Sequence, residues 1–235
     1  MKKGLIYFLI IGLLLSFVSC KEETPEPPAP EPPKYVYGDA TTHPYLDIDG
    51  DGSIFCIDTS ITKAEIPDYF KGIKVTSIKN AAFKDCDSLE SITIPNGVTS
   101  IGNNAFYNCE SLESVTLPNG ITSIGYGAFC NCESLESVTL PNSITSIEDG
   151  VFNSCESLVS ITIPNGVSSI GECAFDACIS LKSVVIPDSV TSIGEDAFSG
   201  CSSLKSIYID KEKDSLVLSN AGIPNTAAVY WRGEF

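Results

Sequence analysis

Positive charge and histidine are scarce in this chain. Lys and Arg together number 14 of 235 residues, against 30 Asp and Glu, which gives a formal net charge of −16. A surface this acidic is repelled by nucleic acid and by anionic lipid, so we expect neither as a partner. The one histidine, His43, excludes metal sites built from several histidines and argues against His-based catalysis. His43 stands beside Pro44 in a polar stretch and is expected on the surface.

The apolar run at the amino terminus is too short to span a membrane. As a helix, Leu5–Val18 would extend about 21 Å, short of the roughly 30 Å needed. Two lysines precede it, as in a secretory signal peptide. It ends in Phe17-Val18-Ser19-Cys20, which resembles the bacterial lipoprotein signal, although that family prefers Leu where Phe17 stands. The resemblance implies that residues 1–19 are a signal peptide and that Cys20 is lipidated; an ordinary secretory peptide is the alternative.

Residues 20–34 predict a lipid anchor followed by a stalk. Lys21-Glu22-Glu23 resembles the Lys-acidic-acidic tag of surface-exported lipoproteins in Bacteroides-like bacteria, with a plain solvated charge cluster as the alternative. Thr24–Pro33 contains six prolines and favours extended polyproline II, about 30 Å long at 3.1 Å per residue. We therefore expect the protein in the bacterial cell envelope, lipid-anchored, in the outer membrane and exposed at the surface, touching the membrane through its lipid only.

From residue 78 onward the chain repeats with a strict 23-residue period and without an insertion. Such a period predicts a solenoid, in which each unit is too small to fold alone and stacked units share one core. The recurring positions are Ile78, Ile101, Ile124, Ile147, Ile170 and Ile193; Phe83, Phe106, Phe129, Phe152, Phe175 and Phe198; Cys86, Cys109, Cys132, Cys155, Cys178 and Cys201; Leu89, Leu112, Leu135, Leu158, Leu181 and Leu204; and Pro95, Pro118, Pro141, Pro164 and Pro187.

One unit shows how the chain turns. Leu89–Ile94 alternates apolar and polar side chains at its end, which predicts a short strand, and Pro95-Asn96-Gly97 predicts a turn. Ala105–Leu112 has three-residue apolar spacing, which predicts a short helical or 3₁₀ turn opposite the strand.

These motifs, Leu-x-x-Ile-x-Ile-Pro followed by Ile-Gly-x-x-Ala-Phe-x-x-Cys, resemble the leucine-rich repeats of BspA-like bacterial surface proteins. The resemblance implies a curved solenoid with a parallel sheet on one face, and roles in adhesion to host or bacterial surface proteins. We expect a solenoid over residues 61–206, in which residues 68–75 carry an insertion. Residues 35–60 are expected to form an amino-terminal β cap, and residues 207–235 a carboxy-terminal cap with Trp231 in its core.

The cysteines predict a buried ladder rather than disulfides. The six repeat cysteines share one inward position, and neighbours in such a stack point the same way instead of toward each other. Buried free thiols are therefore expected. Cys56, Cys130 and Cys173 fall outside the ladder, and the last two lie two repeats apart and should not pair. Cys130-Asn131-Cys132 could be half of a metal site, but no second half is present.

Asp47, Asp49, Asp51 and Asp58 fit the ligand spacing of an EF-hand calcium loop. The flanks alternate as strands rather than helices, however, and Asp49-Gly50-Asp51-Gly52 is a strong hairpin turn. A β-hairpin is the preferred interpretation, and a bound calcium is the alternative.

No Ser-His-Asp set, Gly-rich phosphate loop or zinc motif appears. An active site would break the repeat with an isolated polar cluster, and we expect none in the middle repeats. We therefore expect neither an enzyme nor a cofactor.

The outward positions of the predicted strands form the candidate binding surface. They include an acidic row that gives way to Val159, Lys182 and Lys205 in later repeats. The predicted function is binding of an extracellular or surface protein, from host matrix or bacteria. The alternatives are a structural, self-associating envelope component and a glycan-binding module, the latter disfavoured because Tyr208 is the one outward aromatic expected. The candidate residues are Glu90, Glu113 and Glu136; Ser91, Ser114 and Ser137; and Thr93, Thr116 and Thr139.

Overall fold

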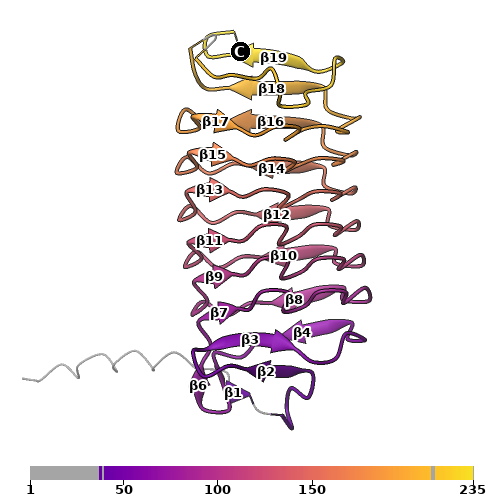
Figure 1. The fold of residues 1–235 in the computed structure, drawn as a ribbon, viewed down its shortest axis with the longest axis vertical. Helices are drawn as coiled ribbons and strands as arrows, with labels where there is room; N and C mark the ends of the chain where they lie inside the picture. Colours follow the sequence, from indigo (N-terminus) through magenta and orange to yellow (C-terminus); the bar gives the residue numbers. More distant parts are fainter. Residues whose placement is uncertain (1–36, 39, 213–214, 235) are drawn as a thin grey trace, which may run out of the picture. The chain divides into compact units, whose positions relative to one another are not determined.

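The computed structural model describes residues 37–234, apart from residues 39 and 213–214. The predicted signal peptide, Cys20 and the stalk lie outside the described residues. The described part is built from strands and turns, stacked as successive coils of a solenoid (Figure 1). It contains no helix long and apolar enough to cross a membrane.

One long sheet, here called the main sheet, runs along the solenoid. Its strands are parallel, and neighbours align one repeat apart, so that Val115 lies between Ile92 and Val138. The predicted parallel β face is confirmed. In spatial order the strands are β19 (Ala228–Trp231), β18 (Ser206–Ile209), β16 (Ser183–Ile186), β14 (Ser160–Thr162), β12 (Ser137–Thr139), β10 (Ser114–Thr116), β8 (Ser91–Thr93) and β4 (Lys63–Glu65).

A second set of parallel strands, which the sequence analysis did not predict, lies beyond the Pro-containing turn of each repeat. Each strand is a Ser-Ile pair with the isoleucine turned toward the core. We call this set the second sheet, and it is interrupted between β11 and β13. Its members are β7 (Ser77–Ile78), β9 (Ser100–Ile101) and β11 (Ser123–Ile124), then β13 (Ser146–Ile147), β15 (Ser169–Ile170) and β17 (Ser192–Ile193).

The amino-terminal end is closed by two small hairpins. β2 (Leu46–Ile48) and β3 (Ser53–Cys56) pair antiparallel, which confirms the hairpin predicted at the Asp-Gly turn, and β3 continues the second sheet at β7. The insertion forms a second hairpin from β5 (Tyr69–Phe70) and β6 (Ile73–Lys74), which pairs with β1 (Tyr37–Gly38).

His43 is buried, and its prediction as a surface residue was wrong. It is 8% exposed and packs edge-on against Phe70 and Tyr45, with ring centroids 6.4 and 6.0 Å away. The Thr42 hydroxyl lies 2.9 Å from its Nδ1 and satisfies that nitrogen. The polar neighbours of His43 in the sequence gave no sign of this, because it is Phe70, in the hairpin of β5 and β6, that packs against the imidazole.

The centre of the core is a continuous stack of phenylalanine rings. Neighbouring rings lie nearly parallel, with centroids 5.1–5.7 Å apart, and each ring is fully buried. This spacing follows from the 4.7–4.9 Å separation of hydrogen-bonded strands, since each ring rides on its own coil. The stack consists of Phe83, Phe106, Phe129, Phe152, Phe175 and Phe198.

The six repeat cysteines are buried and free, as predicted, and the last five of them also act as hydrogen-bond donors. The Cys109 thiol donates to the carbonyl oxygen of Phe83 at 3.1 Å, and each later repeat cysteine does the same to the phenylalanine 26 residues before it. The thiol thus adds a second hydrogen bond to a carbonyl that already accepts a backbone amide within its own turn, as Phe83 O does from Cys86 N at 3.2 Å. Burial raises the pKa of Cys109 and of Cys201 to about 12, so these thiols stay protonated.

The segments opposite the main sheet are not helical or 3₁₀, and that part of the prediction was wrong. Their amides alternate between two partners: Lys84 N donates to Ala81 O within the turn, whereas Asp85 N donates to Tyr107 O of the next repeat. Residues at every fourth position, such as Asn104 and Asn108, take a positive φ of 53° and 59°. This left-handed geometry stops a helix from propagating.

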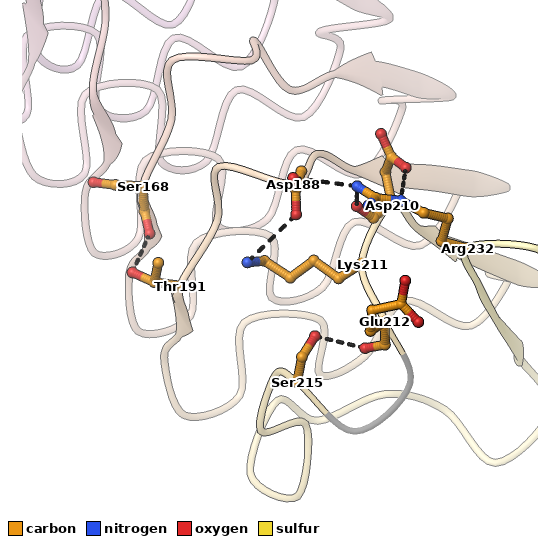
Figure 2. Close-up of polar contacts among 8 residues, drawn as sticks. All are labelled: Ser168, Asp188, Thr191, Asp210, Lys211, Glu212, Ser215 and Arg232. Atoms are coloured by element: carbon orange, nitrogen blue, oxygen red, sulfur yellow. Dashed lines mark hydrogen bonds and ion pairs between the residues drawn. The ribbon is translucent and has the colours of Figure 1, made fainter.

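The carboxy-terminal end is held by an ion-pair network around Arg232 (Figure 2). Its Nε lies 2.8 Å from Asp210 and its Nη2 lies 3.2 Å from Asp188. Lys211 also reaches Asp188, at 3.7 Å. Trp231, in the last strand, is 7% exposed and belongs to the hydrophobic core, which confirms its predicted burial.

Candidate functional site

All nine residues predicted to bind a partner are exposed: the serines and threonines lie in β8, β10 and β12, and each glutamate directly precedes one of these strands. Parallel register aligns them into rows, with Ser91, Ser114 and Ser137 side by side and the threonines in a second row. The structure therefore brings together residues that are 23 positions apart in the sequence.

The glutamate row is continuous with the sheet. Glu113 N donates to Glu90 O at 3.2 Å, and Glu136 N donates to Glu113 O at 3.0 Å. This spacing keeps three like charges on adjacent coils. The row continues through exposed Val159 to Lys182 and Lys205, so this row is acidic at one end and basic at the other.

The basic end also carries apolar and aromatic side chains, part of which the sequence analysis missed. The threonine row continues as Val185, Tyr208 and Tyr230 in register. Val185 is 51% exposed, and the two tyrosine rings stack with centroids 5.2 Å apart. Val185 could have been found by stepping 23 positions from Thr162, whereas Tyr230 follows Tyr208 by 22 positions and lies outside the repeat.

The candidate calcium ligands do not converge. Asp47 pairs with Lys71 at 2.8 Å and Asp49 pairs with Lys79 at 2.7 Å. The other two carboxylates accept nearby hydrogen bonds, Asp51 from Ser53 N and Asp58 from the Ser60 hydroxyl and then from Ser60 N. These bonds hold the pKa of both carboxyls below its usual value. Within the described residues no group of three or more His, Cys, Asp or Glu side chains is arranged to hold a metal.

Cys130 and Cys173 are unpaired, as expected, yet both line one cavity of about 420 Å³ on the turn side of the repeats. Tyr126 lines the same cavity and is 55% exposed. Tyr126 and Glu148, the latter at a position where four repeats have glycine, depart from the repeat consensus on a polar surface. The expectation that the middle repeats contain no such cluster was therefore wrong.

Stacked 23-residue coils with a parallel sheet, a phenylalanine core and one exposed strand face define a leucine-rich-repeat solenoid. Residues 52–178 and 146–217 match the family model described as the BspA type leucine rich repeat region, and the chain belongs to this family. No curated protein is detectably similar to the chain.

Several solved structures resemble it. A leucine rich cell surface protein from Faecalibacterium prausnitzii A2-165 is 32% identical, over 71% of this chain and 53% of its own, with a TM-score of 0.54. The chain thus spans about half the length of that relative. The T. pallidum leucine rich repeat protein (22% identity, 85% of this chain and 80% of its own, TM-score 0.50) and the pneumococcal vaccine antigen PcpA (24%, 77% and 41%, 0.53) are similar in fold alone.

Proposed function

We propose that this chain is a lipid-anchored protein of the bacterial cell surface whose main sheet binds another protein. The observation that carries the proposal is the outer face of that sheet, which is uninterrupted over eight strands, exposed and graded in charge. The 32% identity to a protein described as a cell surface protein supports the location. The proposal assigns no catalytic step to the chain.

The composition of this face suits a protein partner with a basic patch. Glu90, Glu113 and Glu136 would steer such a patch to one end, because like-signed charges on a surface raise the local concentration of the opposite charge. At the other end Val185 and the stacked tyrosines offer the apolar and aromatic groups that interface cores favour. A second copy of this chain, docked head to tail, would meet the same description and is the alternative partner.

The acidic row can be tested by neutralising it. A fragment of residues 34–235, which contains every described core residue, would capture partners from host matrix or whole bacteria. In the variant Glu90→Gln, Glu113→Gln, Glu136→Gln we expect affinity for the captured partner to fall about tenfold, at roughly 0.5 kcal/mol for each charge, and its salt dependence to flatten.

The matched control carries the same change in net charge on another row. Glu110, Glu133 and Glu156 are exposed and keep the same 23-residue spacing, three positions earlier in each repeat. Their replacement by Gln should leave affinity nearly unchanged. Equal losses in the two triple variants would mean that net charge alone attracts the partner, and no loss in either would place the binding site elsewhere.

Surface display can be tested separately on intact cells. Protease added outside should remove the repeats while a periplasmic marker protein stays whole, because a lipid anchor and extended stalk would hold the solenoid clear of the membrane. Immunoblotting with antibody against the repeats gives the readout. Repeats that resist protease until the outer membrane is permeabilised would contradict the proposed location.

A further inference from the structure

The second sheet opens at one place, between β11 and β13. At the other junctions between repeats, a backbone amide after the Ser-Ile pair donates to the previous coil; for example, Gly125 N bonds to Ile101 O at 2.9 Å and Gly171 N bonds to Ile147 O at 2.7 Å. No such backbone bond joins residues 122–125 to residues 145–148, both of which lie within the described part. We call this junction the seam.

A change of residue type coincides with the seam. Two positions after the Ser-Ile pair, several repeats carry an Asn or Asp whose side chain accepts the amide of the equivalent residue in the next coil. Asn80 Oδ1 accepts from Asn103 N at 2.8 Å, and Asp149 Oδ1 accepts from Glu172 N at 2.7 Å. Tyr126 occupies this position at the seam, and its side chain carries no acceptor atom near the backbone, unlike Asn or Asp. The link to Asp149 N is therefore missing.

A second change accompanies the first. The residue directly after the Ser-Ile pair is glycine in four repeats, and packing requires it: a Cβ at Gly125 would lie 2.3 Å from Asn103 Oδ1, and one at Gly171 would lie 2.5 Å from Asp149 N. At the seam this residue is Glu148, and the residue 22 positions earlier is Tyr126. The crowding atoms include the backbone of the previous coil: a Cβ at Gly194 would lie 2.4 Å from Glu172 N, although no Asn or Asp precedes it there. The seam lacks the backbone bond that holds the other coils this close, and a glutamate is accommodated at this junction.

Together these changes leave Tyr126 between two hollows. One, of about 690 Å³, runs along the serine row of the second sheet, and the other, of about 420 Å³, lies on the turn side. Both volumes lie within the range of small-ligand sites. The ring of Tyr126 lies toward the neighbouring coil, with its Cε2 3.9 Å from where a Cβ on Gly150 would stand. An exposed aromatic ring thus forms a wall common to both hollows.

The surroundings of this ring are acidic. Glu148 lines the larger hollow, and Asp149 and Glu172 line the smaller one; all three are exposed. No lysine or arginine lines the smaller hollow. The one lysine of the larger hollow, Lys79, is paired with Asp49 at 2.7 Å.

Elsewhere in the described residues, the chain's own lysines lie over aromatic rings, and two of them also pair with a carboxylate. Lys79 Nζ lies 4.7 Å from the centroid of the Phe55 ring while it pairs with Asp49. Lys71 Nζ lies 5.5 Å from the Phe70 ring while it pairs with Asp47 at 2.8 Å. Nearer the seam, Lys84 lies over Tyr107, which lines the smaller hollow, at 5.2 Å. Within the described residues no lysine or arginine lies over Tyr126 or pairs with the three carboxylates.

We propose that Tyr126, with Glu148, Asp149 and Glu172, binds the ammonium or guanidinium group of a lysine or arginine side chain that a partner protein presents. The cation would lie over the ring and pair with the carboxylates, and its aliphatic stem would follow the larger hollow. The site lies on the second sheet and is separate from the strand face proposed above.

The test uses acetylated, amidated tetralysine and tetra-arginine as probes, titrated into the purified protein by calorimetry at low and moderate salt. The variant Tyr126→Asn, Glu148→Gly restores the residues that other repeats carry, so it is expected to fold and to close the seam. Binding of both probes should weaken at least tenfold in this variant. Tyr126→Phe keeps the ring and should stay within about threefold of the parent chain.

The strand-face variant Glu90→Gln, Glu113→Gln, Glu136→Gln separates this proposal from the proposed function, and it should retain binding of the tetrapeptides within about threefold. The proposal is overturned if Tyr126→Asn, Glu148→Gly binds both probes as well as the parent chain does. It is also overturned if the strand-face variant alone loses them, if neither probe binds, or if neutral maltotetraose binds at Tyr126 in their place, which would make the hollows a glycan site.

Discussion

Replacing Phe129 with alanine is expected to lower the free energy of unfolding by about 3–5 kcal/mol, the largest effect that we expect of a single substitution in this chain. The Phe129 ring is fully buried and stacks on Phe106 at 5.1 Å and on Phe152 at 5.7 Å. Alanine would leave a cavity between two rings that are fixed by their own coils and cannot move together. It would also remove two aromatic contacts worth about 0.5–1.5 kcal/mol each.

Urea unfolding followed by far-UV circular dichroism and by Trp231 fluorescence measures this effect. Phe198→Ala is the matched control, because Phe198 is equally buried but stacks on one phenylalanine ring, that of Phe175 at 5.5 Å. Phe198→Ala should lower the free energy of unfolding by less than Phe129→Ala does, and the difference should equal the energy of about one aromatic contact. If Phe129→Ala cost less than about 1 kcal/mol, the stack would be able to close around the gap, contrary to the rigid spacing of the coils.

The period of the sequence was sufficient to predict the main sheet and the core. Once Phe106 and Phe129 recur one repeat apart, parallel register follows, and each row of side chains takes one direction along the whole solenoid. The exposure of Glu113 and the burial of Cys109 could be predicted for the same reason. In a repeat protein, the burial and direction of a side chain in one coil also apply to the equivalent positions of the other coils.

Features that depend on contacts between coils were harder to predict. Three-residue spacing in Ala105–Leu112 fits a helix, but Phe106 N and Asn108 N bond to the next coil instead, and Ser111 N bonds to the previous one. The second sheet was missed because a Ser-Ile pair is too short to stand out as a strand. The thiol donors were missed since the accepting carbonyl of Phe83 lies 26 residues from Cys109.

The seam was missed for a related reason. Tyr126 and Glu148 are each a single departure from a loosely kept position, and they lie 22 positions apart in the sequence. Their connection appears when the coils are stacked, because both residues then border the seam, where the second sheet lacks its backbone hydrogen bond. A search for residues that depart from the repeat consensus 22 positions apart, rather than 23, would have identified this pair.

Replacing Gly125 with alanine is expected to destabilise the solenoid by about 1–3 kcal/mol, the typical cost of overpacking. The added Cβ would meet Asn103 Oδ1 at 2.3 Å and Asn103 N at 2.6 Å. The backbone at Asn103 cannot retreat easily, because the coil continues in the sheet through Gly125 N and Ile101 O. If the Asn103 side chain turned away instead, its hydrogen bond from Tyr126 N at 3.1 Å would be lost, at about 0.5–1.5 kcal/mol.

The equivalent position at the seam provides the control for this prediction. Glu148 already carries a side chain there, so Glu148→Ala introduces no new contact and should change the free energy of unfolding by no more than about 0.5 kcal/mol. Urea unfolding of both variants beside the parent chain gives the comparison. If Gly125→Ala proved as mild as Glu148→Ala, the glycine would be dispensable at that position, and the close approach of the coils would not explain why four repeats carry it.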